Sequence, residues 1–219
     1  MQPAVEFRNI SKAFGAVQAN ADVSFAIAKG SIHGVIGENG AGKSTLMSIL
    51  YGYYNADSGQ VLIDGTDVTR LSRGRRVRMR RKRIGFMFQS PADNLLEYLT
   101  VRQHLELGAK LRGLRGFKPE VTAMLDRLGL TDRAGHLPHQ LSGGEQQRTA
   151  IGFAAIGPPA VLVADEPTGQ LDHGTVDSVL AAFSVLAETG VAVVAATHDP
   201  AVANRADQTI RMRDGQVVS

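Results

Sequence analysis

A glycine-rich segment that directly follows a predicted strand constrains this chain more than any other feature. Residues 37–45 read Gly-Glu-Asn-Gly-Ala-Gly-Lys-Ser-Thr and match the pattern G-x-x-x-x-G-K-[S/T] in full. The glycines let the backbone wrap around a polyphosphate with its N–H groups pointing inward, and the following helix adds its positive end. The ammonium of Lys43 suits β- and γ-phosphates, and the hydroxyl of Ser44 suits Mg²⁺. We therefore expect a nucleotide-binding α/β protein.

The expected nucleotide-binding residues of this segment are Gly37, Asn39, Gly40, Ala41, Gly42, Lys43, Ser44 and Thr45. A glycine turn that happens to precede Lys-Ser is the alternative, but average residue frequencies place such a match in well under ~1% of chains of this size. By itself, the segment does not distinguish a kinase from a GTPase or a motor protein.

Continuous apolar runs predict strands that are covered on both faces, which is typical of a parallel sheet. These runs are residues 160–164 and residues 191–195, and residues 31–36 predict a further buried strand that leads into the glycine-rich segment. Helical patterns dominate residues 94–156 and favour a helical insert in an α/β layout. The ligand site of such a sheet lies at the carboxyl ends of its strands.

The remaining patterns predict ordinary core elements. Residues 5–10 and 23–27 alternate between apolar and polar side chains, which predicts half-buried strands. Residues 175–188 carry apolar side chains at helical spacing and predict a core helix. No internal repeat or long linker divides the chain, so we expect residues 1–219 to form a single domain.

Composition excludes several classes of protein. The 219 residues include no cysteine, which excludes disulfide scaffolds, thiolate zinc sites and cysteine nucleophiles. The longest apolar run, residues 191–196, is far shorter than the ~20 residues of a membrane-spanning helix. The first residues carry charge where a secretory signal needs an apolar stretch. We therefore expect a cytoplasmic protein.

The net charge of +3 is spread unevenly along the chain. Nine Lys or Arg and no acid lie between Arg70 and Arg83, and the remaining fifteen bases face twenty-one acids. Because the basicity is local, it does not make the whole protein a nucleic-acid binder. A solvated face is the simplest interpretation of the run. Attraction to anionic lipid is a second interpretation, and nucleic-acid binding is a third, although no aromatic residue interleaves the arginines.

Two acids end the apolar run at residues 160–164. A strand that is buried on both faces has no room for a carboxylate, so Asp165 is expected at the sheet edge where the phosphate site lies. There it is placed to hold Mg²⁺, and Glu166 is placed to polarise an attacking water. The alternative is that both acids only serve solubility.

Residues 141–148, Leu-Ser-Gly-Gly-Glu-Gln-Gln-Arg, begin a helix, because Ser142 and Glu145 form a capping-box pattern. This octapeptide resembles the signature motif of ATP-binding cassette (ABC) ATPases. Further matches follow the order of that family, and they are Phe14-Gly15, the glycine-rich segment, Gln89 after a strand at residues 84–88, the signature, Asp165-Glu166, Asp172 and His198. The resemblance covers essentially the whole chain.

The resemblance implies a P-loop NTPase fold with a mainly parallel core sheet, an antiparallel β subdomain and a helical insert. It implies that Phe14 stacks on adenine, that Gln89 contacts Mg²⁺ and the attacking water, and that His198 hydrogen-bonds the γ-phosphate. Mg²⁺ would be held by Ser44, Gln89 and Asp165, and catalysis would rest on Lys43, Gln89, Glu166 and His198.

The family pairs two cassettes head-to-tail around two ATP molecules. In that arrangement Ser142 and Gly144 of one chain face the γ-phosphate held by Lys43 of the other, and Asp172 lies at the same interface. The resemblance thus implies a second ABC ATPase chain as a partner, in the simplest case a homodimer, and a separate transmembrane permease subunit. Docking in this family uses the groove near Gln89.

Details of the signature region resemble the lipoprotein-release and macrolide-efflux group, although that group usually has Asn where Gln170 stands. The expected function is ATP hydrolysis that drives transport, by a cytoplasmic protein peripheral on the inner face of the cell membrane. A soluble ABC ATPase acting on ribosomes or DNA is the alternative, supported only by the run from Arg70 to Arg83, and nucleic acid is not an expected partner. A small-molecule kinase is a third alternative, but it would give no role to the signature, Gln89 or His198.

Overall fold

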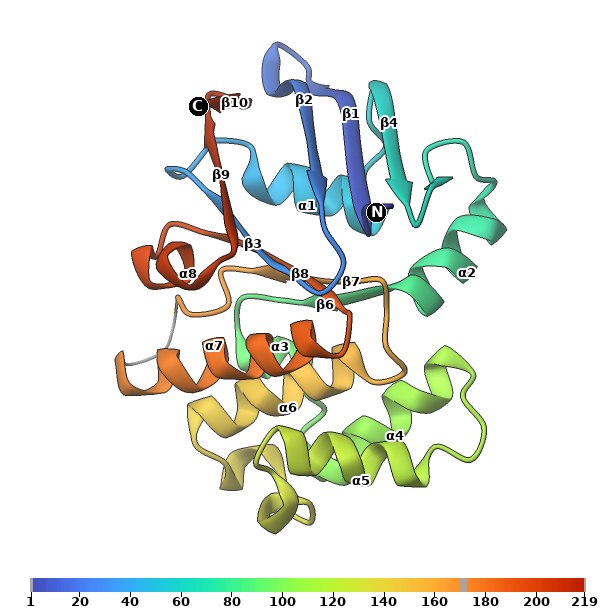
Figure 1. Cartoon of the computed structure of the whole chain (residues 1–219), viewed down its shortest axis with the longest axis vertical. Coiled ribbons are helices and arrows are strands. Elements are labelled where there is room, and N and C mark those ends of the chain that lie inside the picture. The colour runs from blue at the N-terminus through green and yellow to red at the C-terminus, as the bar shows by residue number, and fades with distance from the viewer. Residues whose placement is uncertain (1, 170–172, 219) are drawn as a thin grey trace.

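The computed structural model describes residues 2–169 and 173–218 and contains two β-sheets with helices between and below them (Figure 1). The larger sheet has six strands in the order β10-β9-β3-β8-β7-β6. Its strands are β3 (Ile32–Ile36), β6 (Ile84–Met87), β7 (Val161–Asp165), β8 (Ala192–Thr197), β9 (Gln208–Arg213) and β10 (Gln216–Val218). All neighbours in it pair in parallel except β9 and β10, which pair antiparallel. The expected mainly parallel core sheet is therefore present.

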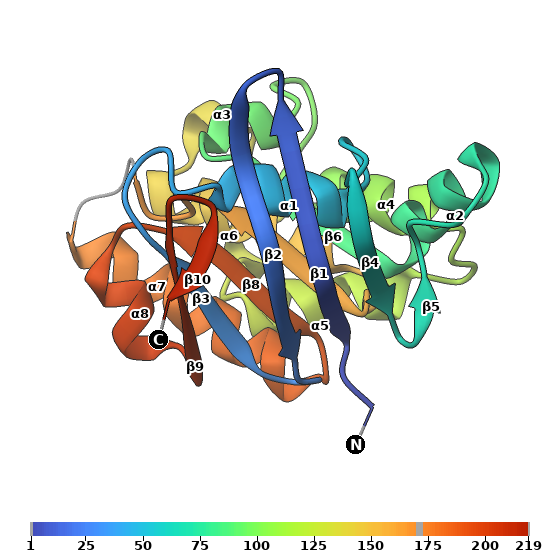
Figure 2. The ribbon, with the colours of Figure 1, turned by 90° about the horizontal axis from the view of Figure 1, so that it is seen from above.

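The second sheet is antiparallel, as the family resemblance implied, and has the order β2-β1-β4-β5. Its strands are β1 (Val5–Phe14), β2 (Val17–Ile27), β4 (Ser58–Ile63) and β5 (Thr66–Asp67). Seen from above, it lies across α1 (Lys43–Tyr51), which runs between the two sheets (Figure 2). Buried residues of α1 and of both sheets form one apolar core there.

The other face of the parallel sheet is covered by helices (Figure 1). Helices α6 (Gly143–Ala155) and α7 (His173–Glu188) share a second apolar core with that face. Strand β7 supplies both cores, because Val161 and Val163 enter the first, and Leu162 and Ala164 enter the second. This alternation explains why the strand is apolar at every position, as the sequence predicted.

Residues 94–156 are predominantly helical in the structure, as expected. The elements there and next to them are α3 (Pro91–Asn94), α4 (Val101–Arg112), α5 (Lys118–Arg127), η1 (Thr131–Arg133), η2 (Pro138–Gln140) and α6. Helix α8 (Pro200–Arg205) follows β8. The basic run forms α2 (Arg73–Arg83), for which the sequence analysis predicted no secondary structure. Within the described residues, none of the helices combines the length and the apolar character that crossing a bilayer requires.

Candidate functional site

The carboxyl ends of β3 and β7 and the segment after β8 meet at one edge of the parallel sheet, next to the start of α1. An open pocket of about 430 Å³ lies there. Its lining residues are Val17, Gln18, Ala19, Asn39, Gly40, Ala41, Gly42, Lys43, Ser44, Thr45, Gln89, Asp165, Glu166 and His198. The structure thus brings together residues that the sequence analysis selected from four separate parts of the chain.

The glycine-rich loop packs too closely against its neighbours to carry side chains at two positions. A Cβ at Gly42 would lie 2.2 Å from the Ala19 carbonyl oxygen, and one at Gly37 would lie 2.3 Å from the Met212 carbonyl oxygen. Gly42 also has a φ of +89°, which favours glycine. The buried Asn20 donates from its side-chain amide to the Gly42 carbonyl oxygen at 3.2 Å. The loop is therefore held in shape by β2 before any ligand arrives.

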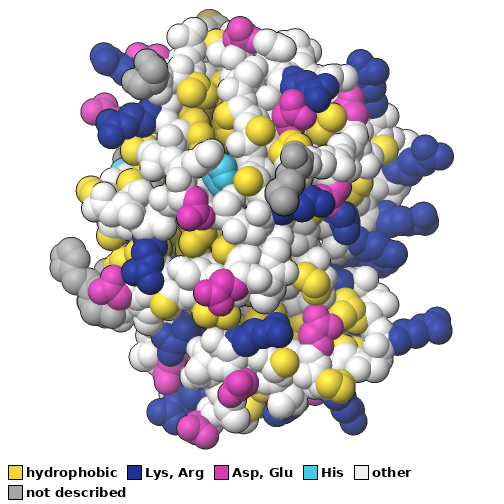
Figure 3. All heavy atoms as spheres, in the orientation of Figure 1, with side chains coloured by type: hydrophobic (Ala, Val, Ile, Leu, Met, Phe, Trp, Pro, Cys, Tyr) yellow, Lys and Arg dark blue, Asp and Glu magenta, His cyan; other side chains and the backbone are white. Residues whose placement is uncertain are grey.

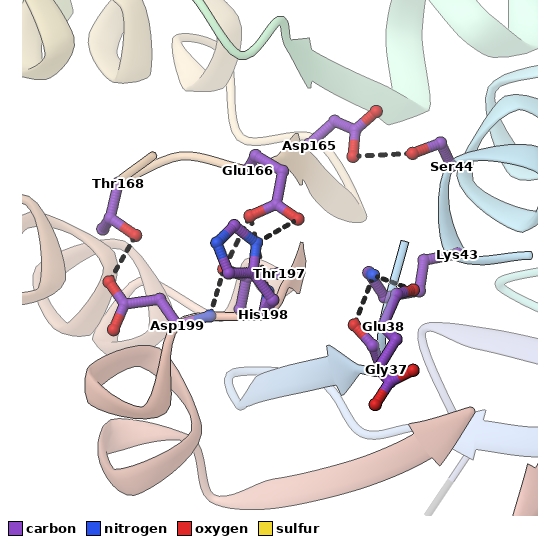
Figure 4. A network of polar contacts seen from close by, with 10 residues as sticks. All are labelled: Gly37, Glu38, Lys43, Ser44, Asp165, Glu166, Thr168, Thr197, His198 and Asp199. Carbon is purple, nitrogen blue, oxygen red and sulfur yellow. Dashed lines mark hydrogen bonds and ion pairs between the residues drawn. The ribbon is translucent and has the colours of Figure 1, made fainter. Parts of the chain in front are cut away.

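Lys43 is buried, and its ammonium lies inside the loop that precedes it. Its Nζ donates to the carbonyl oxygens of Gly37 at 2.6 Å and Glu38 at 3.0 Å (Figure 4). These contacts hold a positive charge within the glycine-rich loop, whose backbone N–H groups are further possible donors. Such an arrangement attracts phosphate oxygens, which make charge-assisted hydrogen bonds with both kinds of donor.

Asp165 ends β7 and faces the start of α1. The Ser44 hydroxyl donates to its Oδ1 at 3.2 Å. Burial raises the pKa of Asp165, and the neighbouring carboxylate of Glu166 raises it further, while the Ser44 hydroxyl lowers it. A hydroxyl and a carboxylate oxygen at this spacing suit Mg²⁺, which prefers hard oxygen ligands and takes only one or two from a protein when phosphates supply the others.

Glu166 has an unusual backbone conformation and a fixed side chain. Its φ is +44°, a region that a residue with a side chain enters at a cost, and its N–H donates to the Ala196 carbonyl oxygen at 2.8 Å. Its Oε2 accepts a hydrogen bond from the Thr197 hydroxyl at 2.9 Å, and its Oε1 lies 3.0 Å from Nδ1 of His198 (Figure 4). Both carboxylate oxygens are therefore held at the pocket wall.

A chain of hydrogen bonds continues behind Glu166. The Thr197 hydroxyl also accepts from the Asp199 N–H at 3.0 Å, and Asp199 Oδ2 accepts from the Thr168 hydroxyl at 2.8 Å. Thr197 is completely buried. The sequence analysis selected neither Thr197 nor Asn20, because a single threonine or asparagine next to a motif carries no recognisable pattern. The only signal is their position, Thr197 as the last residue of β8 and Asn20 within β2.

Phe14 does not line the pocket. It lies at the end of β1 with 44% of its surface exposed, and its ring packs edge-on against Tyr54, with 5.1 Å between the ring centroids. The ammonium of Lys12 lies 5.2 Å from the Phe14 ring centroid. The predicted adenine contact therefore stays a prediction.

Ser142 and Gly144 lie at the start of α6 and do not line the pocket either. The predicted capping box is confirmed, because the Glu145 N–H donates to Ser142 Oγ at 3.3 Å and the Ser142 N–H donates to Glu145 Oε2 at 2.9 Å. Gly144 is packed closely against α7, where an added Cβ would meet Thr175 Cγ2 at 2.6 Å. Asp172 and Gln170 lie outside the described residues.

A buried hydrogen bond links α6 to the strand end that carries the two acids. The side-chain amide of Gln147, which is fully buried, donates to the Pro167 carbonyl oxygen at 2.7 Å. The helix that starts at Ser142 is thus tied directly to the residue after Glu166.

Comparisons with known proteins agree with this site. The model of the ABC transporter family matches residues 21–169. The lipoprotein-releasing system ATP-binding protein LolD of Porphyromonas gingivalis is 38% identical over 98% of this chain and 99% of its own length, and that of Roseobacter denitrificans is 40% identical over 98% and 97%. The macrolide export ATP-binding/permease protein MacB of Neisseria gonorrhoeae is 38% identical, but the chain spans only 34% of that longer relative.

Solved structures show the same fold. A dimeric bacterial ABC transporter cassette superposes with a TM-score of 0.83 at 31% identity, covering 98% of this chain and 97% of that one. A dimeric cassette in a post-hydrolysis state, bound to ADP and phosphate, gives a TM-score of 0.82 at 31% identity, with the same coverage of 98% and 97%.

Proposed function

Because the chain belongs to the ABC transporter family, as an ATP-binding and ATP-hydrolysing cassette, we propose that it binds ATP and Mg²⁺ in the pocket of Figure 4 and drives a separate membrane-spanning permease. The observation that carries this proposal is the lining of one pocket by Lys43, Ser44, Asp165, Glu166 and His198. Phosphate binding, metal binding and water activation need these side-chain types within reach of one another.

The phosphate groups would lie on the amides of the glycine-rich loop, with the Lys43 ammonium at the β- and γ-phosphates. Phosphate oxygens would replace the carbonyl oxygens of Gly37 and Glu38 as partners of Lys43 Nζ. Ser44, Asp165 and Gln89 would hold Mg²⁺, which neutralises charge on the phosphate oxygens when bound.

Glu166 would accept a hydrogen bond from a water and orient it toward the γ-phosphorus. A bond from the water oxygen to phosphorus then forms, one proton of the water passes to the Glu166 carboxylate, the bond from phosphorus to the bridging oxygen breaks, and ADP and phosphate result. Thr197 holds the carboxylate in place for this step, since its hydroxyl donates to Oε2. His198 would hydrogen-bond the γ-phosphate, which is supported by its place in the pocket lining and by the contact of its ring with Oε1 of Glu166.

The second half of each site would come from another copy of this chain. Ser142 is exposed at the start of α6 and lies outside the pocket of its own chain, which supports a role on a partner's nucleotide. The dimeric solved cassettes support the same arrangement. We propose that Ser142 and Gly144 face the γ-phosphate of the partner chain in a homodimer, together with Asp172.

The permease would dock in a groove of about 280 Å³ between the parallel sheet and the helices of residues 94–156; Phe86, three residues before Gln89, lines this groove, whereas Gln89 lines the nucleotide pocket. Two aromatic rings meet in the groove, since the Phe86 ring lies 4.6 Å from that of Tyr51. Leu111 is 51% exposed at the same groove. These apolar groups suit a short helix of a membrane protein at the inner face of the cell membrane. The similarity to LolD and MacB favours a permease of the lipoprotein-release or efflux group.

Replacing Glu166 with Gln tests the catalytic assignment. Glu166→Gln keeps the shape but accepts no proton, so we expect turnover to fall ~10²-fold or more while ATP binding persists and an ATP-bound dimer accumulates. Phosphate release, nucleotide binding and light scattering measure the three quantities. Glu188→Gln, an exposed change at the end of α7, is the matched control and should leave all three unchanged. Undiminished turnover in Glu166→Gln would remove Glu166 from the mechanism.

Partner capture tests the transport assignment. Tagged Glu166→Gln, expressed in the native host and extracted in mild detergent with ATP and Mg²⁺, should co-purify with a polytopic membrane protein. Recovery of ribosomes or DNA without a membrane protein would contradict transport and support a soluble ABC ATPase instead.

A further inference from the structure

Helix α2 (Arg73–Arg83) is attached to the molecule by one side only. On that side the Arg76 guanidinium contacts the Asn55 side chain and donates to the Leu71 carbonyl oxygen at 3.3 Å. The Arg80 guanidinium lies 5.0 Å from the centroid of the Tyr51 ring, and Arg83 forms an ion pair with Asp64. Three of the bases in the run therefore have a structural role.

The opposite side of α2 carries bases that have no such role. Five exposed residues of α2 form no ion pair or side-chain hydrogen bond with any residue that the structure describes, and they are Arg73, Arg75, Arg78, Arg81 and Lys82. At 3.6 residues per turn, the last four lie within an arc of about 120° on the opposite side, whereas Arg73 lies next to Arg80 on the attached side. Figure 3 shows Lys and Arg side chains projecting from the right-hand edge of the molecule, where α2 lies in Figure 1.

The positive charge of this outward face is not offset by the local interactions that usually stabilise a charged helix. No acid lies in the first turn of α2, and the Ser72 side chain makes no capping hydrogen bond. Arg75 and Arg78 repel each other at a spacing of three residues, and Arg78 and Lys82 at a spacing of four. A negatively charged partner would relieve this repulsion, which makes the face complementary to an anionic surface.

The shape and position of the face indicate what kind of partner fits. The bases stand on a convex helix rather than around a pocket, and Val77 among them is 47% exposed. A broad surface contacts several such side chains at once and accepts an apolar one beside them. Nucleic-acid binding fits less well, because no aromatic side chain interleaves these bases to stack on bases.

Helix α2 also borders the groove proposed for the permease, since Val77, Arg80 and Arg81 line it together with Leu111. A permease docked there brings the membrane next to α2. We propose that the outward face of α2, formed by Arg75, Arg78 and Lys82 with Arg81 beside them, lies against anionic lipid headgroups of the membrane. The position of this contact beside a docked permease rests on the proposed function, whereas the attraction of the face to anionic lipid does not.

Vesicle binding by the purified full chain tests this proposal without a permease. The probes are vesicles of phosphatidylcholine with about one third phosphatidylglycerol, and vesicles of phosphatidylcholine alone. The test variant combines Arg75→Gln, Arg78→Gln and Lys82→Gln, none of which lines the groove. The matched control combines Arg127→Gln, Arg205→Gln and Arg211→Gln, which are exposed on other elements and remove the same charge.

We expect the chain and the control variant to bind the anionic vesicles and not the neutral ones, with binding that falls as salt rises. The test variant should lose partitioning on the order of 10²-fold, since each base near an anionic surface contributes about fivefold. Its ATP turnover in solution should equal that of the unchanged chain, which shows that it is folded.

Three outcomes would overturn the proposal. They are no binding of the unchanged chain to anionic vesicles, an equal loss in the control variant, and tighter binding to duplex DNA than to the vesicles at physiological salt. Permease capture is measured separately with the groove intact, so a failed vesicle test leaves the proposed function standing, and a failed capture leaves the lipid contact standing.

Discussion

The phosphate pocket and the start of α6 are the two places that we propose contact phosphate, yet they are completed in different ways. In the pocket, the functional side chains contact other residues of the same chain. Lys43 donates to the Gly37 carbonyl oxygen, and Ser44 donates to Asp165. At α6, the capping box of Ser142 and Glu145 satisfies the helix end locally, and Ser142 does not line the nucleotide pocket of its own chain. In the function proposed above, one chain supplies the phosphate-binding loop of a site, and the signature of a second chain completes it.

Removing the pocket's central charge should have the largest effect. Lys43→Ala takes away the ammonium that two carbonyl oxygens now hold, so ATP loses its main charge-assisted contact. We expect kcat/KM for ATP to fall ~10³-fold or more. Phosphate release and nucleotide titration measure this, and circular dichroism checks the fold. A variant that still binds ATP as tightly as the unchanged chain would contradict the assigned position of the phosphates.

Ser142→Ala should lower turnover ~10²-fold by removing a donor to the partner's nucleotide. It also removes a helix cap, at a cost of ~1 kcal/mol. The chain offers a matched control, because α4 begins with the same capping box, formed by Thr100 and Gln103. Thr100→Ala should lower thermal stability by the same amount and leave turnover unchanged. Equal turnover in the two variants would mean that Ser142 only caps its helix.

A mixed dimer tests whether Lys43 of one chain and Ser142 of the other act on the same nucleotide. When Lys43→Ala and Ser142→Ala chains are co-expressed and purified through two different tags, one composite site carries both changes and the other carries neither. We expect the mixed dimer to turn over ATP well above either parent. Activity no higher than that of the parents would indicate that both residues act within one chain.

Thr197→Val should have a smaller effect. The two side chains have the same shape, but valine has no hydroxyl to hold Glu166 Oε2. Because a hydrogen bond to a charged group is worth about 1.5–3 kcal/mol, we expect kcat to fall ~10-fold or more with KM for ATP nearly unchanged. Thr197→Ser should restore the rate. A change in KM alone would place Thr197 in ATP binding instead.

Asp165→Asn should produce the smallest change, and it is a gain in stability. Burial raises the pKa of Asp165 above its unfolded value, so the folded state takes up this proton first as pH falls. The charged form therefore costs stability, and this cost grows as pH rises from the unfolded pKa through the raised folded one. Without nucleotide at neutral pH, Asp165→Asn should raise Tm by about 1–3 °C. The gain should vanish at acid pH, and a lower Tm at neutral pH would contradict this account.

The sequence predicted the parallel strands β3, β6, β7 and β8, because covered strands are largely apolar, and it predicted the glycine-rich loop, which depends on glycine at Gly37 and Gly42. It missed β9, whose side chains are mostly exposed and include two arginines. It predicted β1 and β2 too short, since the pairing register shifts between Phe7 and Lys12 and interrupts the alternation. Helix α2 was missed because a helix held by arginine contacts has almost no apolar periodicity.

Thr197 and Asn20 were missed for a different reason. Their roles depend on which backbone and side-chain atoms the fold brings beside them, and residue type alone carries none of that information. No local sequence pattern shows that Ser142 lies outside the pocket of its own chain. Only the family resemblance implied that Ser142 acts on the nucleotide of a second chain.

The hydrogen bond from the Gln147 side chain to the Pro167 carbonyl oxygen connects helix α6 directly to the segment that follows β7. In the proposed dimer, α6 would contact the partner's nucleotide, and Pro167 directly follows Glu166, which would orient the attacking water in the chain's own site. Because this linkage is short, we expect the state of the nucleotide at one site of a dimer to change the rate of hydrolysis at the other site.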